Sequence, residues 1–184
     1  MNRLSSAVLV SLLLSSVGCV SHPAYPTSWA PPVSPGAADE CPDLTGVFDD
    51  KGDVPSSTTK PSLSRLFFHH DSQSVKRATH IEIVSAGRTM WRVTAKVDNA
   101  ILAVRDLTAH GCRMGEAEIK DPNEEGGVNR QGIVGYDWSA LNLSRGSDSS
   151  LVVHHRSRAI GLMFLIPMVG SRWIWYRFHV LPNP

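Results

Sequence analysis

The sequence predicts a mainly β protein, a single antiparallel sandwich or small barrel-like domain with at most one or two short helices. Strand-like segments recur at roughly 8- to 15-residue spacing, and turn-forming residues separate several of them. The chain has 184 residues, which suits one domain. Its composition, 42% hydrophobic and 19% charged, is typical of a globular chain rather than a disordered one.

Residues 1–18 are predicted to be a signal peptide that lies outside the fold. Arg3 is the only charge in this segment, and residues 7–14 form an apolar run. That run has the length of a secretory h-region and is too short for a spanning helix, which takes roughly 20 residues. Small residues follow the run and lead directly to Cys19.

The segment Val17-Gly18-Cys19 resembles the lipobox of bacterial lipoproteins, although Ser16 stands where that group usually has Leu. The resemblance implies cleavage before Cys19, a thioether-linked diacylglycerol on its sulfur and a further acyl chain such as palmitate. Two or three chains anchor a protein stably, because each buried CH₂ contributes about 0.8 kcal/mol. By the sorting rule of the group, Val20 after the cysteine implies the outer membrane. The alternative is an ordinary signal peptide with a chance cysteine.

Residues 19–40 are predicted to hold the lipidated cysteine and a flexible, Pro-rich tether, followed by a β-rich globular domain over residues 41–184. Five prolines and few charges occur between positions 20 and 38. Tyr25 and Trp29 are the bulky residues of this segment, placed to touch lipid headgroups or to dock on the domain. A plain spacer is the default interpretation.

Two cysteines remain once Cys19 is lipidated, Cys41 and Cys112. An even pair in an oxidising compartment predicts one disulfide, with two buried free thiols as the alternative. The chain-entropy model assigns roughly 4 kcal/mol to a disulfide that closes so long a loop. Neither cysteine lies in a C-x-x-C motif, so neither a zinc site nor a redox-active pair is predicted.

The alternation of apolar and polar residues that is typical of a strand is clearest over residues 89–97. Here Trp91 and Val93 share one face, and Arg92 and Thr94 share the other. The other predicted strands span residues 63–68, 78–84, 133–138, 140–144, 150–155, 160–166 and 172–180. Helices are predicted only over residues 72–78 and 98–107. Pro167 and Gly170 predict the connection of a last hairpin.

The last predicted strand carries bulky residues on both faces. They are Trp173 and Trp175 on one face and Ile174, Tyr176 and Phe178 on the other. The apolar run at residues 160–169 precedes them. Trp173, Trp175 and Tyr176 are therefore the candidate interaction surface for lipid or a partner, and a fully buried strand is the alternative.

Charge is distributed unevenly along the chain. Residues 39–53 are acidic and residues 145–184 are basic, so the two segments either attract each other or form two solvated faces. Residues 49–53 read Asp-Asp-Lys-Gly-Asp, but Lys51 opposes a cation, so a solvated turn is predicted rather than a calcium site. Residues 121–127 form a second acidic loop, available for a partner contact.

Several classes of function are disfavoured. Lys and Arg total 18 against 17 Asp and Glu, without the basic excess of a nucleic-acid binder. The G-x-S-x-G, H-E-x-x-H and phosphate-loop motifs do not occur in the sequence. The pairs His69-His70, followed by Asp71, and His154-His155 place neighbouring rings on opposite faces of a strand. No catalytic residue, metal site or cofactor is therefore predicted.

A second resemblance involves the two ends of the domain. The start, Cys41-Pro-Asp-Leu-Thr-Gly-Val-Phe48, and the ending, from residues 150–153 through Pro167 to Phe178, look like those of small β-rich proteobacterial envelope lipoproteins. The resemblance implies a location and a β-rich build, and it supplies no catalytic residues.

We expect a non-enzymatic lipoprotein of the bacterial cell envelope, attached to the outer membrane through Cys19 and facing the periplasm. It would bind another envelope component, with the tether raising its effective concentration near membrane partners. One alternative is a carrier of a small apolar ligand in a β-barrel cavity. The other is a hydrolase of an envelope polymer or lipid, which requires His69 or His154 beside a carboxylate.

Overall fold

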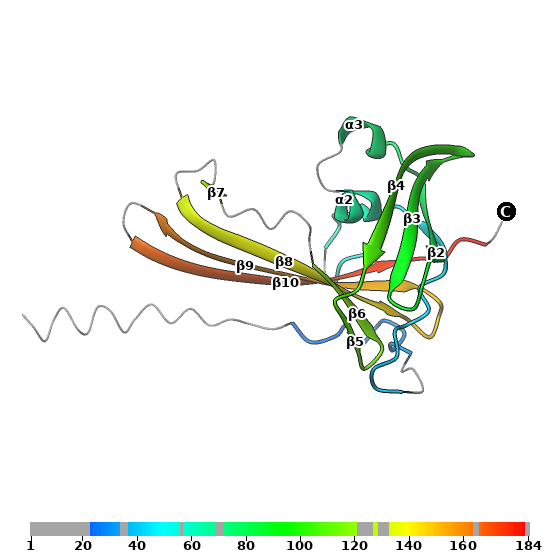
Figure 1. Ribbon diagram of the computed structural model, residues 1–184, viewed down its shortest axis with the longest axis horizontal. Coiled ribbons are helices and arrows are strands. Elements are labelled where there is room, and N and C mark those ends of the chain that lie inside the picture. Colours follow the sequence, from blue (N-terminus) through cyan, green and yellow to red (C-terminus); the bar gives the residue numbers. More distant parts are fainter. Residues whose placement is uncertain are drawn as a thin grey trace, which may run out of the picture.

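The protein is mainly β, and its described residues form two short helices, α2 and α3, and two antiparallel sheets with open edges (Figure 1). The computed structural model describes residues 23–33, 37–55, 57–68, 72–120, 127–128, 133–163 and 166–182. The predicted fold class is confirmed. Of the two architectures it allowed, the open sheets of the described residues fit the sandwich.

The smaller sheet has the strand order β1-β2-β3-β4. Its strands are β1 (Gly46–Asp49), β2 (His80–Ser85), β3 (Met90–Val97) and β4 (Ala100–Thr108). The alternation predicted for β3 is present, because Trp91 and Val93 are buried while Arg92 points outward and pairs with Asp106 across to β4. The predicted helix over residues 98–107 is wrong, since this segment is β4.

The larger sheet has the order β10-β9-β8-β6-β5, with β7 pairing beside β8. Its strands are β5 (Gly111–Arg113), β6 (Glu116–Lys120), β7 (Gly127–Val128), β8 (Ile133–Arg145), β9 (Leu151–Met163) and β10 (Ile166–Phe178). Each of the last three strands is 13 residues long. The two shorter strands predicted within β8, and likewise those within β9, are therefore continuous.

Pro167 and Gly170 do not form the connection that was predicted for them. They lie within β10 and pair with Leu162 and Ala159 of β9. A proline is compatible with this position because β10 is the outermost strand, and an edge strand does not need every N–H for pairing.

Residues 63–68 were predicted as a strand, but the structure has helix α2 (Leu63–Phe67) there. The Ser62 side chain caps this helix by accepting a hydrogen bond from the Arg65 N–H. Leu63 and Phe67 lie four positions apart and are both buried, which is the helical rather than the strand period. Helix α3 (Ser72–Val75) follows, within the predicted helical segment 72–78.

The hydrophobic core lies between the two sheets, with α2 at its margin. Both sheets contribute large, fully buried side chains to it. These include Phe48, Ile81, Ile83 and Val93 from the smaller sheet, and Leu143, Leu151, Val153 and Phe178 from the larger one. In the larger sheet, the buried side chains thus come from the part near β6, on the face that is turned toward the smaller sheet.

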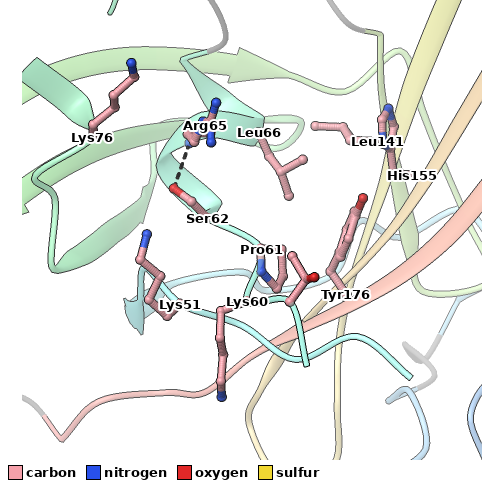
Figure 2. A pocket seen from close by; sticks show the side chains of 11 residues that line it. Lys51, Lys60, Pro61, Ser62, Arg65, Leu66, Lys76, Leu141, His155 and Tyr176 are labelled. Atoms are coloured by element: carbon pink, nitrogen blue, oxygen red, sulfur yellow. Dashed lines mark hydrogen bonds between the residues drawn. The ribbon is translucent and has the colours of Figure 1, made fainter. Parts of the chain in front are cut away.

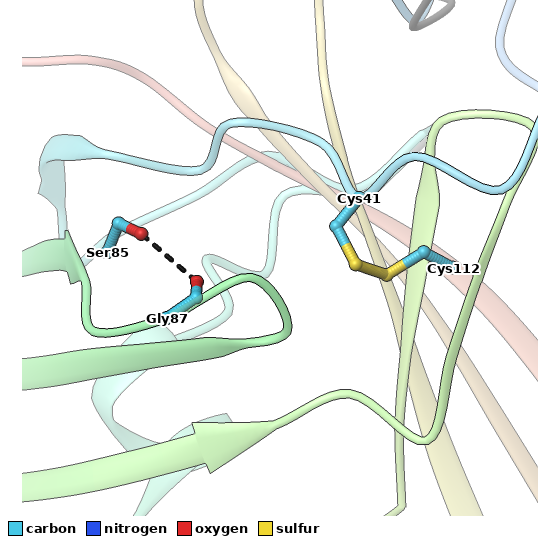
Figure 3. The surroundings of a disulfide bond; sticks show 4 residues. All are labelled: Cys41, Ser85, Gly87 and Cys112. Atoms are coloured by element: carbon cyan, nitrogen blue, oxygen red, sulfur yellow. Dashed lines mark hydrogen bonds between the residues drawn. A yellow bond between two sulfur atoms is a disulfide. The ribbon is translucent and has the colours of Figure 1, made fainter. Parts of the chain in front are cut away.

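A disulfide joins Cys41 to Cys112, as the even cysteine pair predicted (Figure 3). The two Cα atoms lie 4.9 Å apart, and the two positions are 71 residues apart in the sequence. The bond connects the segment before β1 to strand β5, and therefore ties the entry of the smaller sheet to one edge of the larger sheet.

Strands β8, β9 and β10 extend well beyond the rest of the larger sheet (Figure 1). Strand β6 pairs with β8 only over residues 140–143. The parts of the three strands on the far side of this pairing, residues 133–139, 157–163 and 166–172, form a projection that we call the arm. In Figure 1 the arm runs away from the smaller sheet, and at its tip lie the end of β9 and the start of β10.

Candidate functional site

The pairing register assigns alternate side chains of the arm to two faces. One face continues the side of the sheet on which Leu143, Val153 and Phe178 are buried in the core, and we call it the core-side face. The other continues the side of Trp175 and Arg177, and we call it the aromatic face. The two faces differ in the side chains that each one carries.

Exposed apolar side chains are concentrated on the aromatic face. Four large apolar side chains of the arm are described as exposed, and all four lie on this face: Tyr136 (71%), Ile160 (48%), Leu162 (46%) and Val169 (72%). Apart from Arg172, the core-side arm residues whose burial the structure describes are small: Gly135, Ser139, Ser157, Ala159, Gly161 and Gly170. By register, Ile133, Asp137, Met163, Ile166 and Met168 also belong to that face. The exposed apolar side chains that the structure describes on the arm therefore lie on the aromatic face, and the one acidic residue of the arm strands, Asp137, lies on the other.

Cations and aromatic rings alternate near the inner end of the arm, next to the rest of the domain, which we call the body. The guanidinium of Arg158 lies 5.9 Å from the ring centroid of Trp138, and that of Arg156 lies 5.5 Å from that of Trp173. The imidazole of His154 stacks on Trp175 with 3.8 Å between centroids. These side chains belong to three different strands, and the register alone brings them onto one surface.

The residues of the predicted interaction surface are divided between the two faces. Trp173 and Trp175 lie together on the aromatic face, half-buried, whereas Tyr176 lies on the core-side face. His154 and His155 likewise point to opposite faces, as the strand period required, and His155 lies beside Tyr176. A fully buried last strand does not describe β10, because among its bulky residues at positions 173–178 only Phe178 is fully buried.

The N-terminal segment covers the aromatic face where the arm meets the body. The Trp175 Nε1–H donates a hydrogen bond of 3.0 Å to the carbonyl of Pro23. Tyr25 meets Trp175 edge-on with 5.2 Å between centroids, and the Arg177 guanidinium lies 5.2 Å from the ring centroid of Trp29. Trp29 is buried. Residues 23–33 are thus docked on the sheet, so the predicted flexible tether does not extend through them.

Backbone hydrogen bonds fix the other end of this docked segment. The Val33 N–H donates to the Arg145 carbonyl (2.7 Å), and the Ser147 N–H donates to the Pro31 carbonyl (2.9 Å). Arg145 ends β8, and Ser147 lies within the turn that leads to β9. The segment therefore runs from this turn, across the body, to Pro23 beside Trp175, where the covered part of the aromatic face ends.

A cleft of about 570 Å³ lies on the core-side face, between α2 and the sheet (Figure 2). Its charged lining residues are Lys51, Lys60, Arg65 and Lys76. Lys51 and Lys60 are already paired with Asp50 and Asp53. Burial raises the pKa of the Tyr176 phenol in this cleft above its ordinary value. Half of the positive charge in the cleft is therefore neutralised within the protein.

The prediction of a solvated turn at residues 49–53 is wrong for Asp50, which is buried. Its Oδ1 accepts hydrogen bonds from the Ser64 N–H (2.7 Å) and the Ser62 hydroxyl (3.2 Å), and its Oδ2 pairs with Lys51 at 2.8 Å. The carboxylate therefore fixes the first turn of α2 rather than binding a cation.

Several predicted features fall outside the described residues: Cys19, His69, His70, Asp71 and the acidic loop at 121–126. Among the residues that are described, no group of three or more His, Cys, Asp and Glu side chains gathers closely enough to hold a metal ion.

Asp53 links the acidic N-terminal part of the domain to its basic C-terminal end. Its carboxylate pairs with Arg177 at 3.1 Å, with Lys60 at 3.1 Å and with His179 at 2.8 Å. The hydrogen bond with His179, together with those from Lys60 and Arg177, holds the pKa of Asp53 well below its usual value, against the opposing effect of burial. Of the two interpretations of the charge distribution, attraction is the one that holds at this position.

Asp53→Asn is expected to lower the free energy of unfolding at pH 7 by about 1 kcal/mol, since the partly exposed network is screened by water. The Asp53 carboxyl has a lower pKa in the folded than in the unfolded chain. The carboxylate therefore stabilises the fold at pH values above the unfolded pKa of about 4. That contribution is lost as the pH falls below 4 toward the folded value. Urea unfolding at pH 7 and pH 3 measures it: the wild type and Asp53→Asn should differ at pH 7 and differ less at pH 3, where part of the contribution remains because the folded pKa lies well below 4. An equal difference at both values would contradict the assignment.

None of the helices in the described ranges has the length and apolar character needed to cross a membrane. Comparison of the chain with family models, with curated proteins and with solved structures gives no match. The arm, with its unequal faces and its outer edge, is the candidate functional site. From the sequence, the apolar run at 160–169 was the signal that located it, while the contribution of β8 was missed.

Proposed function

We propose that the protein is a non-enzymatic lipoprotein of the bacterial outer membrane, facing the periplasm, that binds an extended segment of another envelope protein along β10. The lipobox-like segment ending at Cys19 supports the anchor. The observation that carries the binding role is the position of β10 as the outermost strand of a projecting arm.

An outermost strand is a template for a further strand, because its outward N–H and C=O groups are arranged for pairing. Along the arm, β10 has β9 on one side, and no described strand pairs with its other side before Asp53 bridges to Arg177. Proteins usually protect such edges with charged residues. Between Ile166 and Tyr176 the only charged residue is Arg172.

Lipid attachment supplies the second half of the proposed mechanism. A domain held at the membrane meets membrane-associated partners at a higher effective concentration than a freely diffusing one. Strand addition provides main-chain hydrogen bonds to the partner, and side-chain contacts on the two faces of the arm provide specificity.

Site-specific photo-crosslinking in cells tests this proposal. Two glycines form a matched pair, Gly170 in edge strand β10 and Gly111 in β5 at the opposite edge of the same sheet. A Cβ added at either position meets no atom within 4 Å, so a photoreactive side chain fits at both. We expect one reproducible protein adduct from Gly170 and none from Gly111. Equal adducts from the two positions, or none from Gly170, would contradict edge binding.

Gly135→Val is expected to disrupt the arm while leaving the body folded. A Cβ at Gly135 would clash with the Ile160 carbonyl oxygen and would lie 2.5 Å from the Gly161 Cα, both backbone atoms of β9. The two strands cannot stay paired at that separation. We expect loss of the adduct formed from position 170, with the urea midpoint of the body nearly unchanged. Retention of the adduct would show that the arm is not the binding element.

A further inference from the structure

We infer that the arm lies flat on the bilayer that holds the lipid anchor, with its aromatic face against the lipid. This inference rests on the proposed attachment through Cys19. It assigns the exposed apolar surface of the arm to a membrane, and it leaves the edge of β10 and the core-side face to the protein partner.

The position of Pro23 limits where the anchor can be. Cys19 precedes Pro23 by four residues, a span that reaches at most about 14 Å when fully extended. Because the Pro23 carbonyl accepts a hydrogen bond from Trp175, the lipidated residue must lie within that reach of the inner end of the arm. Trp175 itself lies on the aromatic face.

The length of the arm excludes one orientation. Strand β10 runs nine residues from Trp175 to Ile166, which at about 3.3 Å per residue is roughly 30 Å. An arm standing upright with its tip in the bilayer would lift Trp175 to about that height. The tether, at about 14 Å, is too short to span it. Two orientations remain, in which the arm lies along the bilayer or points away from it.

The chemistry of the aromatic face favours the orientation along the bilayer. Exposed aliphatic side chains, aromatic rings and arginines are the composition of surfaces that lie in the headgroup region. The aliphatic and aromatic groups enter the acyl boundary, while arginines place their guanidinium groups at the phosphates. On this face the arm carries Tyr136, Trp138, Arg158, Ile160, Leu162 and Val169. By register, none of the described arm residues on this face is Asp or Glu.

The docked N-terminal segment ends where this surface begins. It covers the aromatic face over the body, up to the contacts of Tyr25 and Pro23 with Trp175. The face is therefore protected from solvent by protein over the body, and by the bilayer over the arm. In this arrangement the β10 edge lies in the plane of the membrane, where a membrane-associated partner can pair with it.

Fluorophores attached to the two faces test the inference. In the lipidated protein an introduced cysteine is the only free thiol, because Cys19 is modified and Cys41 is bonded to Cys112. Ile160→Cys and Ala159→Cys are a matched pair, since the two exposed neighbours point to opposite faces of β9. Each variant is labelled with a bimane and reconstituted in vesicles of phosphatidylethanolamine and phosphatidylglycerol with brominated acyl chains.

We expect bromine quenching of the label at position 160 to exceed that at position 159 by roughly threefold or more, because short-range quenching reports burial at the acyl boundary. Weak, equal quenching in protein that still floats with the vesicles would overturn the flat arm and leave the anchor intact. Strong, equal quenching would also overturn it, since both faces would then be in lipid. Failure of the protein to float would instead overturn the proposed anchor.

Discussion

Replacing Cys41 and Cys112 together with serine is expected to lower the free energy of unfolding by roughly 4 kcal/mol, because the disulfide restricts the unfolded chain over a long loop. The two positions are 71 residues apart, and both helices and the whole smaller sheet lie between them. A typical domain of this size has only about 5–15 kcal/mol of stability, so the loss is a large fraction of it. Urea unfolding monitored by tryptophan fluorescence measures the change.

Two controls accompany the double variant. Reduction of the wild-type disulfide should produce the same loss without any substitution. Met114→Ser, near Cys112 but exposed, should change stability by about 0.5 kcal/mol or less. If the double variant unfolded at the wild-type urea concentration, the bond would not constrain the chain as described.

Phe178→Ala is expected to cost about 3–5 kcal/mol, because it removes a large side chain from the middle of the core and leaves a cavity. Phe178 is 0% exposed, and its ring packs so closely on Gly52 that a Cβ there would lie 2.6 Å from it. The residue also ends β10, so it connects the arm strands to the core. Urea unfolding again provides the measurement.

The matched control for Phe178→Ala is Val180→Ala, two residues further along the chain. Val180 is 38% exposed, so its truncation should cost about 1 kcal/mol or less. Equal losses for the two variants would mean that the last residues of β10 do not lie in the core as described.

The β class and most strand positions were predictable because alternation in segments such as β3 reflects one buried and one solvated face. Helix α2 was not, because the sequence over residues 63–68 is apolar enough for either structure. The helix depends on Asp50, whose carboxylate accepts the Ser64 N–H from fourteen positions away. A tertiary contact of that kind leaves no periodic signal. Similarly, pairing with β9 overrides the turn tendency of Pro167 and Gly170.

The candidate site was predictable only in part. Trp173 and Trp175 could be assigned to one face from the strand period alone. The contributions of Tyr136 and Ile160 depend on the register of three strands, which the sequence of a single strand does not determine. The docking of residues 23–33 was hidden by a Pro-rich composition that is typical of free linkers.

Intact mass spectrometry of the protein recovered from isolated membranes tests the central proposal most directly. The account predicts a chain that begins at Cys19 and carries the added mass of a diacylglycerol and a further acyl chain. Cys19→Ser should abolish this product and its membrane association. A chain that still contains Met1, carries no lipid and is found in the soluble fraction would contradict the proposal.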